Sequence, residues 1–183
     1  MNIPLFEGEL IRLTPPDPDR DAEIESKWTH DVEYMRLLSA DPVRPLSPAL
    51  IKKKYEEAEK EKATHRYHFA IRTRADDRLA GFVRLDHIEW NNGTSQVTLG
   101  IGDPNDRGRG FGAETLKLIL RYGFAELNLH RVTADTHEYN ERALRFLERA
   151  GFVVEVRRRQ AVHRDGKRWD VIKLGLLREE YKP

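Results

Sequence analysis

An apolar alternation, a glycine-rich turn and an amphipathic helix follow one another between residues 97 and 126. Val97, Leu99 and Ile101 alternate with Thr98 and Gly100, which is typical of a half-buried strand. The next segment, Asp103-Pro-Asn-Asp, cannot continue a strand, because proline lacks a backbone donor and Asn and Asp favour turns. After the turn, apolar residues recur at helical spacing, at Leu116, Ile119, Leu120 and Phe124. The stretch therefore predicts a buried strand, a sharp elbow and a helix running from residue 113 to residue 126.

The elbow has the composition of an anion-binding loop. Its glycines allow the backbone to approach a ligand closely and to point several N–H groups towards it. The first turn of the helix that follows adds unpaired N–H groups and a partial positive charge. Two arginine side chains add full charges. We expect a phosphate site formed by Arg107, Gly108, Arg109, Gly110, Phe111, Gly112 and Ala113.

One ligand that suits such a loop is a dinucleotide. Gly108-x-Gly110-x-x-Ala113 matches the loose dinucleotide fingerprint, and Asp135 would then bind the ribose of a nicotinamide cofactor in an oxidoreductase. The order of the elements argues against this interpretation. Strands predicted at 67–73, at 79–88 and from residue 94 are joined by short turns, including Asn91-Asn92-Gly93, so they form an antiparallel meander. A dinucleotide fingerprint normally opens the first strand–helix unit of a parallel sheet.

The remaining segments surround this meander. A short strand is expected over residues 9–14, followed by a helix that Asp19 or Asp21 caps. Two further helices precede the meander, the second of which starts at Ser47-Pro48. After the amphipathic helix we expect a strand at 131–135, parallel to the central one, then a helix from Asn140 to Gly151. A hairpin of residues 152–159 and 168–177 ends the chain.

Composition limits the function classes. The 183 residues suit one domain, 1–183, and a net charge of +1 gives no overall attraction to nucleic acid or to an anionic membrane. No run of about 18 apolar residues or signal-like start is present, so a cytoplasmic protein is expected. The chain has no cysteine, which excludes disulfides, thiol catalysis and cysteine metal sites, and no metal is expected.

The order of elements and several short motifs resemble the GNAT superfamily of N-acetyltransferases along nearly the whole chain. Arg107-x-x-Gly110-x-Gly112 matches the pyrophosphate loop of that family. The RimJ/RimL-like branch is suggested by four motifs, Gly-Phe-Gly-Ala-Glu-Thr (110–115), Leu-His-Arg-Val (129–132), Asn-Glu-Arg-Ala (140–143) and Asp-Gly-Lys-Arg-Trp-Asp (165–170). The resemblance implies an α+β fold with a central, mostly antiparallel twisted sheet of about seven strands, a splayed parallel pair and flanking helices.

The resemblance also implies an activity, which is acetyl transfer from acetyl-CoA to a primary amine by direct attack on the thioester. The acceptor would be a protein N-terminus, a polyamine or another small amine, and a homodimer is expected. Backbone groups of Leu99, Gly100 and Ile101 would pair with the pantetheine arm, and Asn140 would lie beside it. Asn140 is equally well explained as a plain helix cap.

The chain departs from the family where a proton donor is expected. Many members carry a tyrosine seven residues after the Asn, and this chain has Leu147 there. Tyr139 is a substitute candidate for the acid, while Asp86 or Glu89, at the end of the strand beside the central one, is a candidate base. Because the usual tyrosine is missing, an acetyl-CoA-binding regulatory module with little catalysis is a second interpretation.

Overall fold

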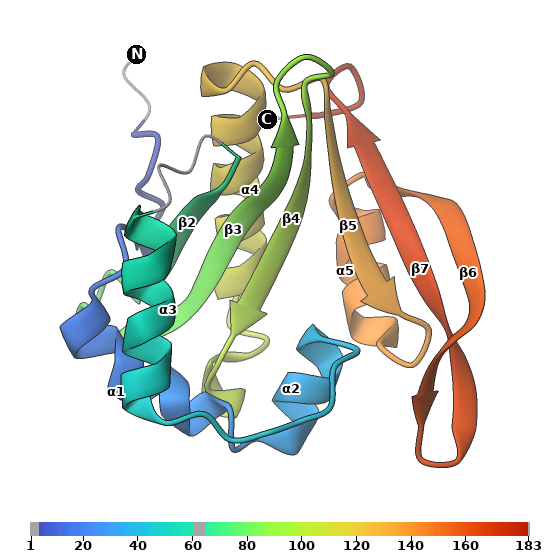
Figure 1. The fold of residues 1–183 in the computed structure, drawn as a ribbon. Helices are drawn as coiled ribbons and strands as arrows, with labels where there is room; N and C mark the ends of the chain where they lie inside the picture. Colours follow the sequence, from blue (N-terminus) through green and yellow to red (C-terminus); the bar gives the residue numbers. More distant parts are fainter. Residues whose placement is uncertain (1–3, 61–64, 183) are drawn as a thin grey trace.

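The computed structural model describes residues 4–60 and 65–182, so residues 1–3, 61–64 and 183 of the predicted domain lie outside the described residues. The polypeptide alternates strands and helices along its length (Figure 1). In chain order the elements are β1 (Ile11–Thr14), α1 (Pro18–Trp28), α2 (Val32–Leu38), α3 (Pro48–Lys60), β2 (Tyr67–Thr73), β3 (Leu79–Glu89), β4 (Thr94–Ile101), the 3₁₀ turn η1 (Pro104–Asp106), α4 (Phe111–Arg121), the π turn η2 (Tyr122–Glu126), β5 (Arg131–His137), α5 (Glu141–Arg149), β6 (Val153–Arg164) and β7 (Lys167–Leu177).

Seven strands of the described chain form one sheet in the order β1-β2-β3-β4-β5-β7-β6. Every neighbouring pair is antiparallel except β4 and β5. These two strands pair only where residues 94–96 meet residues 131–133, and beyond that point they diverge (Figure 1). The predicted mostly antiparallel α+β sheet with a splayed parallel pair is confirmed, and the fold is not a doubly wound parallel domain.

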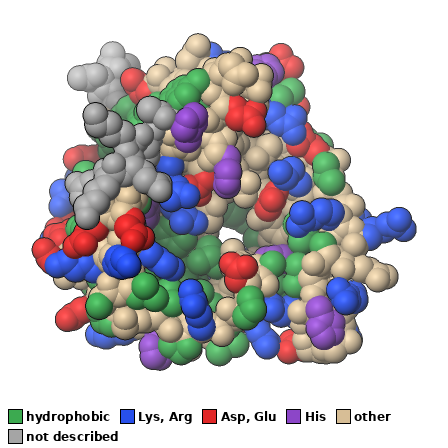
Figure 2. Space-filling model, in the orientation of Figure 1, with side chains coloured by type: hydrophobic (Ala, Val, Ile, Leu, Met, Phe, Trp, Pro, Cys, Tyr) green, Lys and Arg blue, Asp and Glu red, His purple; other side chains and the backbone are tan. Residues whose placement is uncertain are grey.

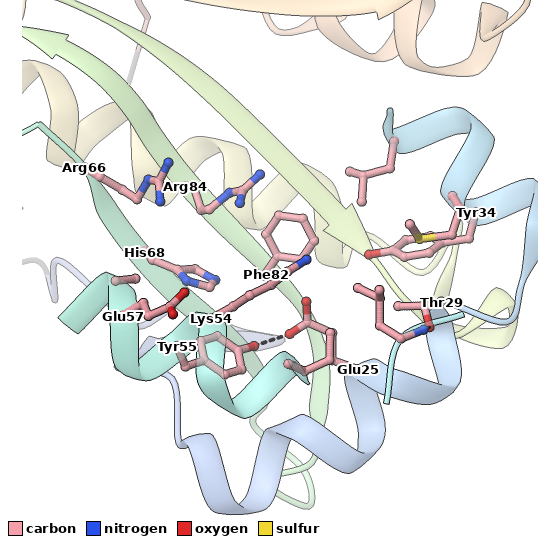
Figure 3. Close-up of a pocket in the computed structure, with 15 residues that line it drawn as sticks. Glu25, Thr29, Tyr34, Lys54, Tyr55, Glu57, Arg66, His68, Phe82 and Arg84 are labelled. Carbon is pink, nitrogen blue, oxygen red and sulfur yellow. Dashed lines mark hydrogen bonds between the residues drawn. The ribbon is translucent and has the colours of Figure 1, made fainter. Parts of the chain in front are cut away.

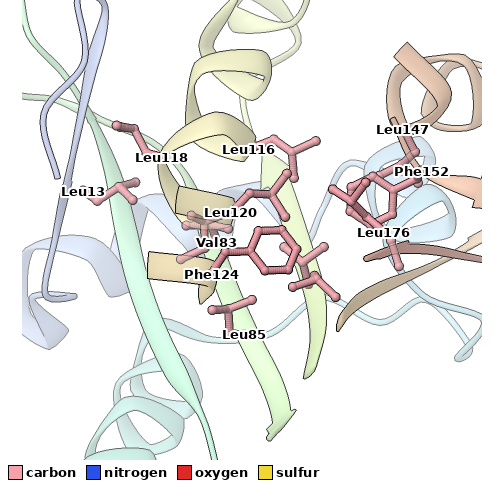
Figure 4. Close-up of a cluster of buried hydrophobic side chains, with 14 of the residues drawn as sticks. Leu13, Val83, Leu85, Leu116, Leu118, Leu120, Phe124, Leu147, Phe152 and Leu176 are labelled. Carbon is pink, nitrogen blue, oxygen red and sulfur yellow. The ribbon is translucent and has the colours of Figure 1, made fainter. Parts of the chain in front are cut away.

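Helices cover both faces of the sheet. In Figure 1, α4 and α5 lie behind it, whereas α1 and α3 lie in front and α2 crosses below the ends of β4 and β5. The larger apolar core lies on the side of α4 and α5, where Val83, Leu116, Phe124 and Leu176 are buried together (Figure 4). A smaller cluster around Trp28 and Phe82 joins the sheet to α1 and α2. The helices on the two faces therefore brace the diverging strands from opposite sides.

Local differences from the sequence prediction have simple causes. The amphipathic helix begins two residues early, at Phe111, and its last turn widens into η2. Asp17, which accepts from the N–H groups of two following residues, caps α1, while Asp21 is buried. The final hairpin is longer than expected, and β7 lies between β5 and β6, so β6 is the edge strand opposite β1. None of the helices within residues 4–60 and 65–182 is long and apolar enough to span a membrane.

Candidate active site

A cleft of about 1010 Å³ opens where β4 and β5 separate. Its walls are the last half of β4, the glycine-rich loop, the start of α4, the end of β5 and one side of α5, and α2 closes one end. In the space-filling view the molecule is hollowed at this place, near the middle of the face (Figure 2). The volume lies at the upper end of the range usual for ligand sites, which suits a long, flexible ligand.

The backbone of β4 offers hydrogen-bonding groups to this cleft. The N–H of Gly102 donates to Ala80 O on the β3 side at 3.0 Å. Backbone groups of successive strand residues point to opposite edges of the strand, so the N–H and C=O groups of Leu99 and Ile101 point towards β5, which diverges from β4. Those of Gly100 face β3, where Gly100 pairs with Phe82. Of the three predicted β4 residues, Leu99 and Ile101 therefore present backbone groups to the cleft, and Gly100 contributes by lacking a side chain.

The glycine-rich loop and the start of α4 form the second set of donors. Gly108 and Gly110 have φ angles of 85° and 92°, which other residues rarely adopt. Gly110 is the N-cap of α4 and offers no side chain to cap it. The hydrogen bond of the first helical turn is donated by Glu114 N–H to Gly110 O at 3.0 Å. No atom of residues 4–60 or 65–182 accepts a hydrogen bond from the N–H groups of Gly112 or Ala113. The loop therefore has the geometry of an anion site at a helix N-terminus.

The side chains of the two loop arginines are bound to other groups of the protein. The Arg107 guanidinium donates to Ile101 O at 3.3 Å, to Gly102 O at 2.9 Å and to the Asp31 carboxylate at 3.0 Å. A ligand in the cleft would therefore meet the backbone of Arg107 and not its guanidinium. Arg109 lies 3.4 Å from the buried carboxylate of Asp106. Its guanidinium also packs on the ring of Phe111. These contacts fix the loop in place before any ligand arrives.

Cations that the sequence analysis did not select line the cleft from α5. Arg142, Arg145 and Arg149 project on one side of the helix, because positions i, i+3 and i+7 share a face. A Cβ added to Gly108 would lie 3.6 Å from the Arg142 guanidinium, so Arg142 reaches the loop. Asn140, which also lines the cleft, caps α5 by accepting from Ala143 N–H at 3.1 Å. The helical spacing of these arginines was the signal that could have identified them.

The three predicted acid–base residues are not brought together. Asp86 is buried on β3 between two arginines, accepting from Arg66 Nε at 2.5 Å. Glu89 is exposed at the β3–β4 turn, where its carboxylate accepts from Asn92 at 2.8 Å. Tyr139 does line the cleft, but its hydroxyl donates to the Arg36 carbonyl of α2 at 2.7 Å. Of the three, only Tyr139 therefore lies where the predicted chemistry would take place.

A different tyrosine, Tyr34, places its hydroxyl at the cleft. Tyr34 is buried on α2, and within the described residues its Oη has no hydrogen-bond partner. It lies against β4, because a Cβ added to Gly100 would be 2.6 Å from Oη. Its ring packs under the Arg107 guanidinium, 5.4 Å from the ring centre. Burial raises the pKa of Tyr34, so the group stays protonated at every pH of interest. Nothing in the sequence distinguishes Tyr34 from a core tyrosine.

Within the described residues, no group of three or more His, Cys, Asp or Glu side chains is placed to hold a metal ion. The available chemistry is that of backbone donors, arginines, a buried phenol and carboxylates. Such a set binds a phosphorylated ligand at one end and stabilises developing negative charge near β4 at the other.

Comparison with known proteins identifies the family of the chain. Residues 11–153 match the model of the acetyltransferase (GNAT) domain. The probable N-acetyltransferase YjcK of Bacillus subtilis is 31% identical over 81% of this chain and 83% of its own length. The SPbeta prophage-derived uncharacterized N-acetyltransferase YokL of the same organism is 28% identical over 100% of this chain and 98% of its own. In fold, the chain resembles spermidine N-acetyltransferase from Vibrio cholerae, solved with CoA and spermine, with a TM-score of 0.84, 21% identity and coverage of 95% and 99%.

Proposed function

Since the chain belongs to the GNAT acetyltransferase family, we propose that the cleft between β4 and β5 holds acetyl-CoA and presents its acetyl group to a primary amine. The chain is thus an N-acetyltransferase with acetyl-CoA as donor. The observation that supports this use of the cleft is the alignment of two sets of free backbone donors, those of Leu99 and Ile101 along β4 and those of Gly112 and Ala113 at the start of α4.

Each wall of the cleft has a role in this proposal. The N–H groups from Gly108 to Ala113 bind the pyrophosphate. Arg107 is paired with Asp31, so Arg142 supplies the positive charge at the loop. The exposed edge of β4 pairs with the amide groups of the pantetheine arm. Asn140 caps α5 through its side-chain oxygen and lines the cleft, so its amide nitrogen would donate to the same arm. The thioester would then lie near Gly100, beside the Tyr34 hydroxyl.

The reaction needs a neutral amine and a stabilised leaving sulfur. The amine nitrogen bonds to the acetyl carbon, the carbon–sulfur bond breaks, and one amine proton is finally found on the CoA thiol. An N–H of β4 stabilises the oxygen of the reacting carbonyl group. Tyr34, which burial keeps protonated, donates a hydrogen bond to the sulfur as it leaves, and the proton that the amine gives to water reaches the thiolate from solvent. Because a thiol titrates near 8.5, thiolate departure at pH 7 costs only about 2 kcal/mol, so this help is useful but limited.

Calorimetry and thiol release test the assignment. Acetyl-CoA and CoA are expected to bind and to raise the melting temperature, whereas NADH is not. Free thiol should then appear in the presence of a mixture of primary amines. Binding of acetyl-CoA without thiol release from any amine would favour the regulatory module, and stabilisation by NADH alone would favour the oxidoreductase.

The Tyr34→Phe variant is expected to lower kcat by about 30-fold at pH 7, the factor that corresponds to about 2 kcal/mol. The ring and its packing under Arg107 are retained, so the Kd of CoA should stay unchanged. Stopped assays of thiol release measure kcat, and calorimetry measures the Kd. Tyr139→Phe is the matched control, because its hydroxyl is already bonded to Arg36. A larger loss of kcat in Tyr139→Phe than in Tyr34→Phe would transfer the donor role to Tyr139.

A homodimer remains our prediction, with the edge strand β6 as the surface that mediates it. Three valines of this strand, Val153, Val154 and Val156, have relative exposures of 57%, 46% and 49%. An exposed strand edge with apolar side chains favours pairing with a second chain. Light scattering at micromolar concentration should give the mass of a dimer, and Val154→Lys should shift it towards the monomer. A monomer mass for the unchanged protein would contradict the prediction.

Three finer expectations from the sequence also remain predictions: the RimJ/RimL-like branch, the single domain 1–183 and the cytoplasmic location. The branch concerns the identity of the acceptor amine, since the solved structures that share the fold include spermidine N-acetyltransferases. A protein N-terminus, a polyamine and a small amine are all primary amines that this chemistry can acetylate.

A further inference from the structure

A second, smaller pocket lies on the other face of the sheet. It has a volume of about 390 Å³ and is enclosed by α1, α2 and α3 above strands β2 and β3 (Figure 3). Tyr34 lines both this pocket and the cleft between β4 and β5. An acceptor in the pocket would thus approach β4 from the face opposite α4. We call this space the α1–α3 pocket.

Three buried polar atoms in the α1–α3 pocket lack hydrogen-bond partners within the described residues. They are Tyr34 Oη, His68 Nε2 and Arg84 Nε. The Arg84 atom lies 3.4 Å from a carboxylate oxygen of Asp86, but without hydrogen-bond geometry. Buried polar groups are normally satisfied, because leaving one unpaired costs free energy. Tyr34 Oη faces the proposed thioester position, and the other two atoms, His68 Nε2 and Arg84 Nε, indicate a polar ligand in the pocket.

The pocket carries charges of both signs on different walls. Arg84 projects from β3 and Arg66 from the residue before β2, with Arg84 over the ring of Phe82 (Figure 3). Both contact the single carboxylate of Asp86, so two cations share one anion. On the helical side Glu25 accepts from Tyr55, whose hydroxyl points to it in Figure 3. Burial raises the pKa of Glu25 and lowers that of His68 to about 3, so the histidine is neutral.

These charges do not suit an oligocation. A polyamine carries only positive charges, and it would meet Arg66, Arg84 and Lys54 as well as the acidic residues of the pocket. A molecule with an amine and a carboxylate matches both walls, since its carboxylate can pair with the Arg84 guanidinium and its ammonium with Glu25. The small volume fits a molecule of amino-acid size.

Resting on the proposed function, we propose that the α1–α3 pocket binds the acceptor as a small zwitterion, an amine that carries its own carboxylate, held by Arg84 at one end and by Glu25 at the other. Tyr34 lines both this pocket and the cleft and so stands between the bound ligand and the thioester position. The ammonium gives its proton to water before the neutral amine attacks. Arg66 supports Arg84 by holding Asp86 at 2.5 Å, so that one guanidinium remains available to the ligand.

Matched pairs of acceptors test the inference. Each pair is an amino acid and the amine that lacks its carboxylate, namely leucine with isopentylamine and γ-aminobutyrate with propylamine, and spermidine is assayed beside them. In the unchanged protein at least one amino acid should have a kcat/KM about tenfold or more above that of its paired amine, the usual size of a charge-assisted contact. Thiol release provides the rates at saturating acetyl-CoA.

Variants assign the contacts. Arg84→Met should lower kcat/KM for the preferred amino acid about tenfold, mainly through KM, and leave the paired amine unchanged. Arg84→Lys should restore part of the difference. Glu25→Gln keeps an acceptor for the Tyr55 hydroxyl but removes the charge, so kcat/KM should fall for both members of the pair. Arg20→Met, which removes an exposed arginine of α1, is the control and should change neither.

The outcomes separate this inference from the proposed function. If spermidine is the best acceptor and Arg84→Met changes no ratio, the zwitterion is wrong while the acetyltransferase assignment stands. If peptides with a free N-terminus are acetylated and neither amino acid is, the inference is likewise overturned. If acetyl-CoA binds but no amine releases thiol, the proposed function fails, and the inference fails with it. Calorimetric binding of CoA to Arg84→Met, unchanged in Kd, shows that the variant is folded.

Discussion

The Gly112→Glu variant is expected to weaken the binding of CoA about a thousandfold. Gly112 lies in the first turn of α4, and its missing side chain would point towards Leu99, Ile101 and Phe146 at the wall of the cleft. A carboxylate there would stand beside the pyrophosphate. Two like charges about 4 Å apart, at an effective dielectric constant near 20, repel by about 4 kcal/mol. Titration calorimetry with CoA measures the change in Kd directly.

Gly112→Ala is the matched control. A Cβ at this position would lie 3.8 Å from Leu99 and 4.0 Å from Phe146, which are ordinary contacts. Alanine also favours the helix, and a glutamate in the first turn suits the helix dipole, so both variants should fold. Gly110 is a poorer choice for this test, since its φ of 92° would strain any substitute. Unchanged CoA affinity in Gly112→Glu would show that the pyrophosphate lies elsewhere.

The Asp21→Ala variant is expected to lower the free energy of unfolding by about 3–5 kcal/mol, because it leaves a buried arginine without its counter-ion. Asp21 on α1 and Arg72 on β2 are joined by two hydrogen bonds, of 2.8 and 2.9 Å, and their side chains are 0% and 5% exposed. Urea denaturation should show a lower midpoint with an unchanged slope.

Two further variants test the cause. In Asp21→Ala with Arg72→Met both charges are removed, so the double variant should be more stable than Asp21→Ala alone. Asp19→Ala, on the same helix, removes an exposed pair with Lys52 and should change stability far less. If Asp21→Ala were no less stable than Asp19→Ala, the buried pair would have no special role in attaching α1 to the sheet.

Much of the fold follows from local patterns in the sequence. Alternation along residues 97–101 and the Asn91-Asn92-Gly93 turn place β4 beside β3, and the glycines at 108 and 110 require an elbow with positive φ. The short motifs around Gly110 and Asn140 led to the GNAT family, which the matching domain model confirms. These features are local, because each depends on residues that are neighbours along the chain.

The candidate site was predicted in part. The positions of the loop and of the β4 segment beside the diverging strands follow from the sequence, and so does the helix cap at Asn140. The side-chain partners do not. Arg107, expected at the phosphate, is instead bound to Asp31, which lies 76 positions earlier in the chain. Asp86, expected as a base, is held by Arg66 and Arg84 in the interior of the protein.

By itself the sequence determined the order of the elements, the antiparallel meander and the anion-binding loop, since periodicity, turn residues and glycine conformation act over a few residues. Only the tertiary structure decided which charges are free and which are paired. It turned Asp21 from an expected cap into the buried partner of Arg72, and among the described residues it gave the Tyr34 hydroxyl, beside Gly100, no hydrogen-bond partner. The reason is physical: the free energy of a buried polar group depends on the partners that packing brings to it, and those partners are distant in sequence.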